Sequence, residues 1–146
     1  MTILNATLQK FGYPGSVICD FDHWVVLIRP VQVTLASAVI AAKSDVVSFG
    51  ALRPDQMAEL SSVIQRFESV VAGGFGAEKF NYLGLMMVDP NPHFHAIPRY
   101  RAPVSYLDKW FTDERFPKPP ALDVVNECSI EMLHTLRKDL ALRFKS

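Results

Sequence analysis

One amphipathic segment, residues 54–71, constrains the fold more than any other part of the sequence. Its apolar side chains recur every three or four residues, the spacing that gives a helix one apolar face. These side chains are Met57, Leu60, Val63, Ile64, Phe67, Val70 and Val71. Pro54 suits the first helical position, and the glycines at positions 73, 74 and 76 end the pattern. The segment therefore predicts a long helix whose apolar face is buried in a core.

Candidate strands lie on both sides of this helix. Residues 16–20, 24–30 and 36–43 are short apolar runs, and residues 80–88 form another. The alanines in residues 36–43 leave a helix open as the alternative there. Because the early connections are short, neighbouring strands should pair antiparallel. The pattern predicts an α+β fold with an antiparallel sheet of about five strands and one long central helix.

The two ends of the chain add helices to this plan. Residues 2–10 have a weak helical pattern, whereas residues 122–144 have the apolar spacing of a C-terminal helix. Residues 101–120 lie between the sheet and that helix and include a proline cluster. Proline interrupts both helices and strand ladders, so we expect this segment to wrap over the surface in an extended form.

Composition bounds the kind of protein. A chain of 146 residues is expected to be one domain over residues 1–146, with a core at about residues 16–105 and a wrap and helix at 106–146. Lysine plus arginine equals aspartate plus glutamate, 15 each, so no overall charge attracts nucleic acid polymers or a membrane. Cys19 and Cys128 are isolated, and no secretory signal or membrane-spanning run is present. We predict a cytoplasmic location.

Two histidines stand at alternating positions of the last candidate strand, after the turn signal Asp-Pro-Asn-Pro. Successive strand side chains point to opposite faces, so Asn91, His93 and His95 should share one face. Phe94 and Ala96 should then face the core. The residues alone leave three uses for the histidines open: hydrogen bonding without chemistry, part of a metal site, or nucleophilic or acid–base catalysis at a phosphate.

The sequence around this strand resembles the histidine triad (HIT) family. Residues 91–99, NPHFHAIPR, are similar to the family motif His-φ-His-φ-His-φ-φ, where φ is apolar, in the version that continues with Pro-Arg. The similarity extends over about residues 16–122, including Leu-Arg-Pro-Asp-Gln at 52–56, which opens the helix. Residues 111–122 resemble the tail of a bacterial subgroup often labelled diadenosine polyphosphate hydrolase. Asn91 replaces the first triad histidine.

The resemblance implies an α+β fold, a homodimer and an enzyme that acts on small nucleotides. In the family, the middle histidine attacks the α-phosphorus of a nucleoside phosphate ester, anhydride or amidate. Water then releases the mononucleotide from the nucleotidyl-histidine intermediate. Aligned on Pro98 and Arg99, the middle histidine is His93 and the third is His95. We therefore predict a hydrolase or transferase acting on dinucleoside polyphosphates or related conjugates, with no cofactor and no resident metal.

Two alternatives stay open at these positions. The stretch Asn-Pro-His-Phe-His also resembles the related hexose-1-phosphate nucleotidylyltransferases, and in that register His95 is the nucleophile. The continuation Ile-Pro-Arg favours the register that makes His93 the nucleophile. Asn91 can form hydrogen bonds but cannot carry a proton as a histidine does. A nucleotide-binding module with weak or no catalysis is therefore the second functional hypothesis.

Three further residues are candidate contacts to the nucleotide. Asn91 is expected to supply a hydrogen bond beside the histidines. Arg99 follows the strand and can bind a phosphate through two parallel hydrogen bonds. Trp24 offers an aromatic face on which a purine can stack, although a core position is the alternative for a tryptophan in so apolar a strand.

Overall fold

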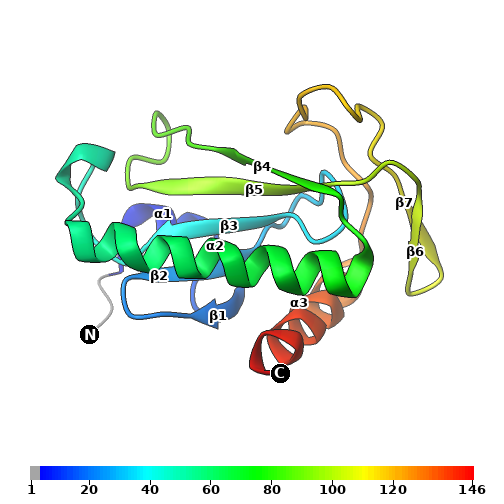
Figure 1. Cartoon of the computed structure of the whole chain (residues 1–146), viewed down its shortest axis with the longest axis horizontal. Coiled ribbons are helices and arrows are strands. Elements are labelled where there is room, and N and C mark those ends of the chain that lie inside the picture. Colours follow the sequence, from blue (N-terminus) through cyan, green and yellow to red (C-terminus); the bar gives the residue numbers. More distant parts are fainter. Residues whose placement is uncertain (1–3) are drawn as a thin grey trace.

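A computed structural model describes residues 4–146 as an antiparallel sheet with helices on both faces (Figure 1). The strands of this sheet lie in the order β1-β2-β3-β5-β4. They are β1 (Val17–Asp20), β2 (Trp24–Ile28), β3 (Ala38–Ala42), β4 (Lys79–Leu83) and β5 (His93–Arg99). The other elements are α1 (Ala6–Lys10), the 3-10 helix η1 (Phe49–Ala51), α2 (Pro54–Phe75), the hairpin β6 (Val104–Tyr106) and β7 (Lys109–Phe111), and α3 (Ile130–Lys145). The predicted α+β class, with five antiparallel strands, a long helix and a C-terminal helix, is confirmed.

The helix α2 crosses one face of the sheet and forms the main core together with α3 (Figure 1). Its buried side chains Leu60, Val63, Phe67 and Val71 belong to the predicted apolar face. The helix continues one turn beyond its predicted end and stops at Gly76, which has φ +82°. A Cβ on Gly74 would lie 2.9 Å from Arg143 Nη1, so the missing side chain makes room for α3.

The short helix α1 covers the opposite face of the sheet. Leu8 and Phe11 pack there in a second, smaller apolar cluster with side chains of β2 and β3. His93 and His95 pair with Ala41 and Val39 of β3, and both of these partners belong to this cluster. Directly paired residues of neighbouring strands point to the same face, so the two histidines lie between the sheet and α1. Phe94 and Ala96 point to the main core, as predicted.

Several predicted boundaries differ from the structure. The run at residues 80–88, expected to be one strand, is a strand only as far as Leu83, and Met87 in the loop after it is 91% exposed. The predicted strand is too long because the sequence does not show whether an apolar residue is buried in a strand or exposed in a loop. Within residues 36–43, Ala38–Ala42 form the strand β3, and the alternative of a helix there is wrong. The N-terminal helix begins at Ala6, and residues 1–3 lie outside the described part of the chain.

The C-terminal third contains a hairpin that the sequence pattern did not predict. The strands β6 and β7 are joined by Leu107 and Asp108, which have φ of 51° and 61°. A turn with two left-handed residues normally carries asparagine or glycine, so this sequence gives little sign of it. The last helix begins after Ser129, whose side chain accepts a hydrogen bond from the Met132 amide. Residues 122–129 are therefore not part of the helix, contrary to the prediction.

Candidate active site

His93 lies at the start of β5 under α1 and is fully buried. Its Nδ1 is 2.8 Å from the backbone oxygen of Asn91. A carbonyl oxygen only accepts hydrogen bonds, so Nδ1 carries the proton and Nε2 carries the lone pair of the neutral ring. Among residues 4–146, nothing hydrogen-bonds to this Nε2. The ring is thus held in the tautomer that a nucleophilic histidine needs.

The side chain of Phe11 covers both imidazoles. Its ring centroid lies 5.9 Å from that of His93 and 5.7 Å from that of His95. The two imidazole centroids are 5.2 Å apart, so the three rings form one cluster. Because His93 has no exposed surface, a phosphate can reach its Nε2 only when side chains that cover the ring move aside, and Phe11 is one of the side chains in contact with it.

His95 has the opposite tautomer. Arg29 Nε lies 3.2 Å from His95 Nδ1. Since a guanidinium only donates hydrogen bonds, Nδ1 accepts and the proton of the neutral ring is on Nε2. Burial, together with the charges of Arg29 and His93, lowers the pKa of His95 to about 4. With both rings in their neutral forms, the site therefore combines one imidazole with an Nε2 lone pair and another with an Nε2 hydrogen.

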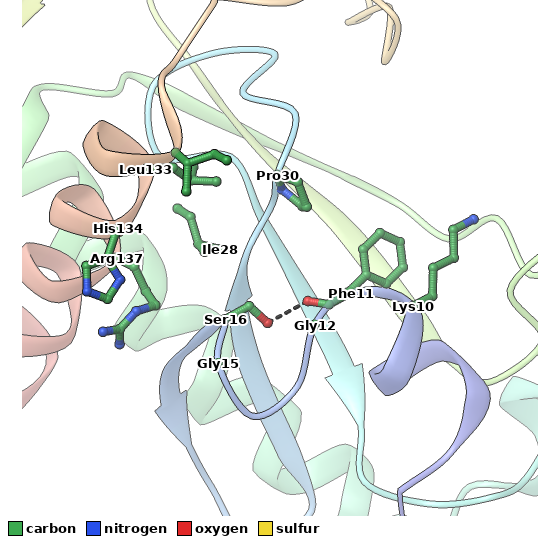
Figure 2. Close-up of a pocket in the computed structure, with 11 residues that line it drawn as sticks. Lys10, Phe11, Gly12, Gly15, Ser16, Ile28, Pro30, Leu133, His134 and Arg137 are labelled. Atoms are coloured by element: carbon green, nitrogen blue, oxygen red, sulfur yellow. Dashed lines mark hydrogen bonds between the residues drawn. The ribbon is translucent and has the colours of Figure 1, made fainter.

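Two cavities flank Phe11. The first, of about 460 Å³, is lined by His95, by Arg29 and by residues of the loop between β4 and β5. The second, of about 260 Å³, lies between the loop after α1, the end of β2 and the helix α3, with Ile28 and Leu133 in its wall (Figure 2). Lys10, Phe11 and Pro30 line both cavities, so the two are adjacent. A ligand with two parts has room on either side of Phe11.

Asn91, two residues before β5, links α1 to the sheet by hydrogen bonds. Its Oδ1 accepts hydrogen bonds from the amide nitrogen of Thr7, at 3.3 Å, and from its hydroxyl, at 3.2 Å. Its Nδ2 donates to the backbone oxygen of Val46 at 3.0 Å. Asn91 is buried, and its side-chain polar groups bond to the protein. The residue supports the site through the position of α1, and its backbone oxygen fixes the tautomer of His93.

Replacing Asn91 with alanine should lower the free energy of unfolding by about 1–3 kcal/mol, because it removes the side-chain hydrogen bonds to buried Thr7 and half-buried Val46. Urea unfolding measures this loss, and hydrogen exchange should show faster exchange at the amides of α1. Gln65→Ala is the control, since Gln65 is exposed on α2 and its removal should change stability by less than about 0.5 kcal/mol. Equal losses in the two variants would contradict this role for Asn91.

Arg99 connects the sheet to the segment after β7, here called the C-terminal wrap, through Asp113 and Lys118. It does not line the cavity beside His95. Its guanidinium donates to both carboxylate oxygens of Asp113, at 2.7 and 3.1 Å. It also donates to Asn81 Oδ1 at 2.6 Å and to the backbone oxygen of Lys118 at 2.7 Å. With the side chain buried among these partners, the expected phosphate contact by Arg99 has no support in the structure.

Trp24 is part of the main core. It is fully buried, and its indole nitrogen donates to the backbone oxygen of Gln56 at 2.7 Å. Its ring stacks on Phe94 with centroids 6.4 Å apart. This face of the sheet is the one covered by α2, opposite the histidines. The structure therefore places Trp24 in the core, and the expected stacking on a purine is not supported.

Three residues of the site were missed at the sequence level: Lys10, Phe11 and Arg29. Arg29 ends an apolar strand, and Lys10 and Phe11 follow a weak helical pattern, so none of them belongs to a motif. The sequence therefore contains no pattern that would have identified them. Within residues 4–146, no three side chains of histidine, cysteine, aspartate or glutamate converge as a metal site would require.

The contribution of His95 to stability should disappear on acidification. Its pKa in the folded protein, about 4, is below its ordinary value of 6.5, so the unfolded chain binds the proton more tightly. Stability from this group is then complete above pH 6.5 and is lost as the pH falls through 4. Urea midpoints between pH 7 and pH 4 should fall more for the wild type than for His95→Gln. The exposed His134 provides the control, because the urea midpoint of His134→Gln should fall as much as that of the wild type.

Comparisons with known proteins identify the fold. The sequence matches no protein-family model and no curated protein. The structure is similar to a histidine triad protein from Sinorhizobium meliloti, with a TM-score of 0.72 and 18% identity over 99% of this chain and 96% of that one. It is also similar to a histidine triad protein from Bradyrhizobium japonicum, with a TM-score of 0.70 and 18% identity over 99% and 96%. A third similar structure is that of a hypothetical histidine triad nucleotide-binding protein from Sulfolobus tokodaii. It has a TM-score of 0.69 and 15% identity over 95% of this chain and 89% of that one. The chain has the fold of the histidine triad proteins.

Proposed function

We propose that this chain is a histidine triad enzyme that transfers the nucleoside monophosphate group of a small nucleotide conjugate to water or another acceptor. The observation that carries the proposal is the fixed tautomer of His93. Its Nδ1 donates to the Asn91 backbone oxygen, and its Nε2 lone pair has no partner among the described residues. The fold and the resemblance of residues 91–99 to the family motif support the same reaction.

The proposed reaction has two steps at one phosphorus atom. His93 Nε2 attacks the α-phosphorus, and the bond to the leaving group breaks, with its electrons going to that group. A water molecule then attacks the same phosphorus and gives up a proton to the solvent, the bond to Nε2 breaks with its electrons returning to the ring nitrogen, and the mononucleotide leaves. His95 carries a hydrogen on Nε2, so it can donate to a phosphate oxygen in both steps. Dinucleoside polyphosphates and adenosine phosphoramidates are the substrate classes.

The two cavities suggest how such a ligand lies. The cavity beside His95 contains the cationic side chains Lys10 and Arg29, which suit a phosphate. The cavity on the other side of Phe11 has the apolar wall residues Ile28 and Leu133, which suit a base or sugar (Figure 2). Movement of Phe11 between them would expose His93 to the phosphorus that joins the two parts.

The proposal includes a homodimer in the cytoplasm. The strand β4 is an edge of the sheet and pairs only with β5 among the described residues, which leaves its other side open for a second copy. Within residues 4–146, no helix has the length and the apolar character needed to cross a bilayer.

The test is adenosine monophosphate release from diadenosine polyphosphates and from adenosine phosphoramidates by the full-length protein. Rapid quenching in denaturant at alkaline pH, where a phosphorus–nitrogen bond to histidine survives, and mass spectrometry should show a protein species heavier by one nucleoside monophosphate group. Release of the mononucleotide together with this species supports the proposal. Absence of release with every substrate of both classes contradicts it.

A nucleotide-binding module without efficient catalysis is the second candidate. Two observations favour it: Asn91 stands where the family motif has a histidine, and Phe11 covers the nucleophile. Calorimetry with adenosine and guanosine monophosphates separates the two candidates. Binding without turnover supports the module, and turnover refutes it.

A further inference from the structure

We infer that Arg29 anchors the phosphate of the ligand and also positions His95. This inference rests on the proposed function, because it assigns a role within the same site. Arg29 directly follows Ile28, the last residue of β2, and its side chain lines the cavity beside His95. The motif at residues 91–99 gives no indication of it, since Arg29 lies 66 positions before His95.

The hydrogen bonds of Arg29 leave one side of its guanidinium unused. Its Nε donates to His95 Nδ1 at 3.2 Å, and its Nη1 donates to the backbone oxygen of Val31 at 2.8 Å. A guanidinium has five N–H groups. Among residues 4–146, Arg29 makes no other hydrogen bond and no ion pair, so its three remaining N–H groups are free to bind a ligand. Two of them belong to Nη2, which has no protein partner in this part of the chain.

No carboxylate of residues 4–146 forms an ion pair with Arg29. Of the described residues that line the same cavity, Asp89 is the only acidic one, and it pairs with Lys10 at 2.9 Å. Burial lowers the pKa of Arg29, but a guanidinium stays charged at neutral pH. A half-buried cation without a counter-ion favours an anion in the cavity. The planar donor edge fits two oxygens of one phosphate.

The bond from Nε to His95 gives Arg29 a second effect. It keeps Nδ1 of His95 as an acceptor and so keeps the ring hydrogen on Nε2. The groups that face His95 are Arg29, His93, Asp89 and Lys10, and Arg29 is the charged group with the largest influence on it. A phosphate bound to Arg29 would therefore meet a hydrogen-bond donor on His95. Arg29 would thus make the phosphate contact that was expected of Arg99 from the sequence.

The experiment uses the full-length protein with Arg29→Met, Arg29→Lys and the control Arg101→Met, since Arg101 is exposed and outside both cavities. Calorimetry with adenosine monophosphate and with adenosine separates phosphate binding from base binding. We expect Arg29→Met to weaken monophosphate binding by about 10- to 100-fold, the range for one lost charged hydrogen bond, and to leave adenosine binding unchanged. Arg29→Lys should lose less affinity for the monophosphate, because the positive charge remains. Arg101→Met should bind the monophosphate as tightly as the wild type.

Nitrogen NMR of the histidine rings supplies a readout that needs no ligand. The wild type and Arg101→Met should show His95 with its hydrogen on Nε2, and both Arg29 variants should show a mixture of tautomers. Monophosphate binding by Arg29→Met within twofold of the wild type would overturn the anchoring role. An unchanged His95 tautomer in both Arg29 variants would overturn the positioning role. If the wild type binds no nucleotide, the proposed function and the anchoring role fail together, and the NMR result still decides the positioning role.

Discussion

Replacing His93 with alanine is expected to lower the rate of mononucleotide release by at least about 10³-fold. The imidazole forms the bond to phosphorus, so without it only direct attack by water remains. The effect should fall on kcat, and the nucleotidyl-protein species should vanish from the mass spectrum. Steady-state kinetics on diadenosine polyphosphates measures kcat, and samples quenched in denaturant at alkaline pH show whether the nucleotidyl-protein species is present.

His23→Ala is the matched control for this experiment. His23 lies in the turn between β1 and β2, with its Nε2 3.4 Å from Asp55, and it lines neither cavity. Its replacement should leave release unchanged. His95→Ala tests the alternative register of the motif. If the covalent species is absent in His95→Ala but present in His93→Ala, His95 is the nucleophile. Release that is equal in His93→Ala and the wild type would refute nucleophilic catalysis by His93.

The parts of the fold that were predicted are those whose signal is local. The apolar spacing of α2 repeats within a few residues, so the sequence alone identifies the helix and its buried face. Burial itself is not a local property. Leu85, Met87 and Val88 look like a continued strand in sequence, yet all three are exposed on the loop beside the site. The hairpin β6–β7 was missed because its turn, at Leu107 and Asp108, lacks the residues that usually mark such a turn.

The same limit applies to the candidate site. The motif predicted that His93 and His95 share a face, because strand alternation is local. The backbone oxygen of Asn91, which fixes the tautomer of His93, is local, but the other supporting groups come from distant segments. Arg29 is 66 positions from His95, and Thr7, which links α1 to Asn91, is 84 positions from it. These pairs meet only because β2, β3 and β5 are neighbours in the sheet and α1 packs on them. Strand order is not contained in the local pattern, so the sequence could not show that Arg29 lies beside His95 whereas Arg99 pairs with Asp113.

Replacing Asp113 with alanine should lower the free energy of unfolding by about 3–5 kcal/mol, the range for a buried ion pair that loses one partner. The side chains of Arg99 and Asp113 are 4% and 3% exposed, so the guanidinium would remain charged with little access to water. Asp113 also accepts a hydrogen bond from the Tyr100 amide at 3.1 Å, which the variant loses. Urea unfolding followed by circular dichroism measures the change.

Two further variants separate the buried charge from the loss of a contact. Glu78→Ala removes the partner of Arg101, whose side chain is 71% exposed, and should cost less than about 1 kcal/mol because water solvates the remaining charge. Arg99→Met combined with Asp113→Ala removes both buried charges, so it should recover much of the stability lost in Asp113→Ala alone. If Asp113→Ala costs no more than Glu78→Ala, the buried pair does not stabilise the attachment of the C-terminal wrap. A double variant as unstable as Asp113→Ala would instead assign the loss to the hydrogen bond with Tyr100 and to packing, since no unpaired charge would remain.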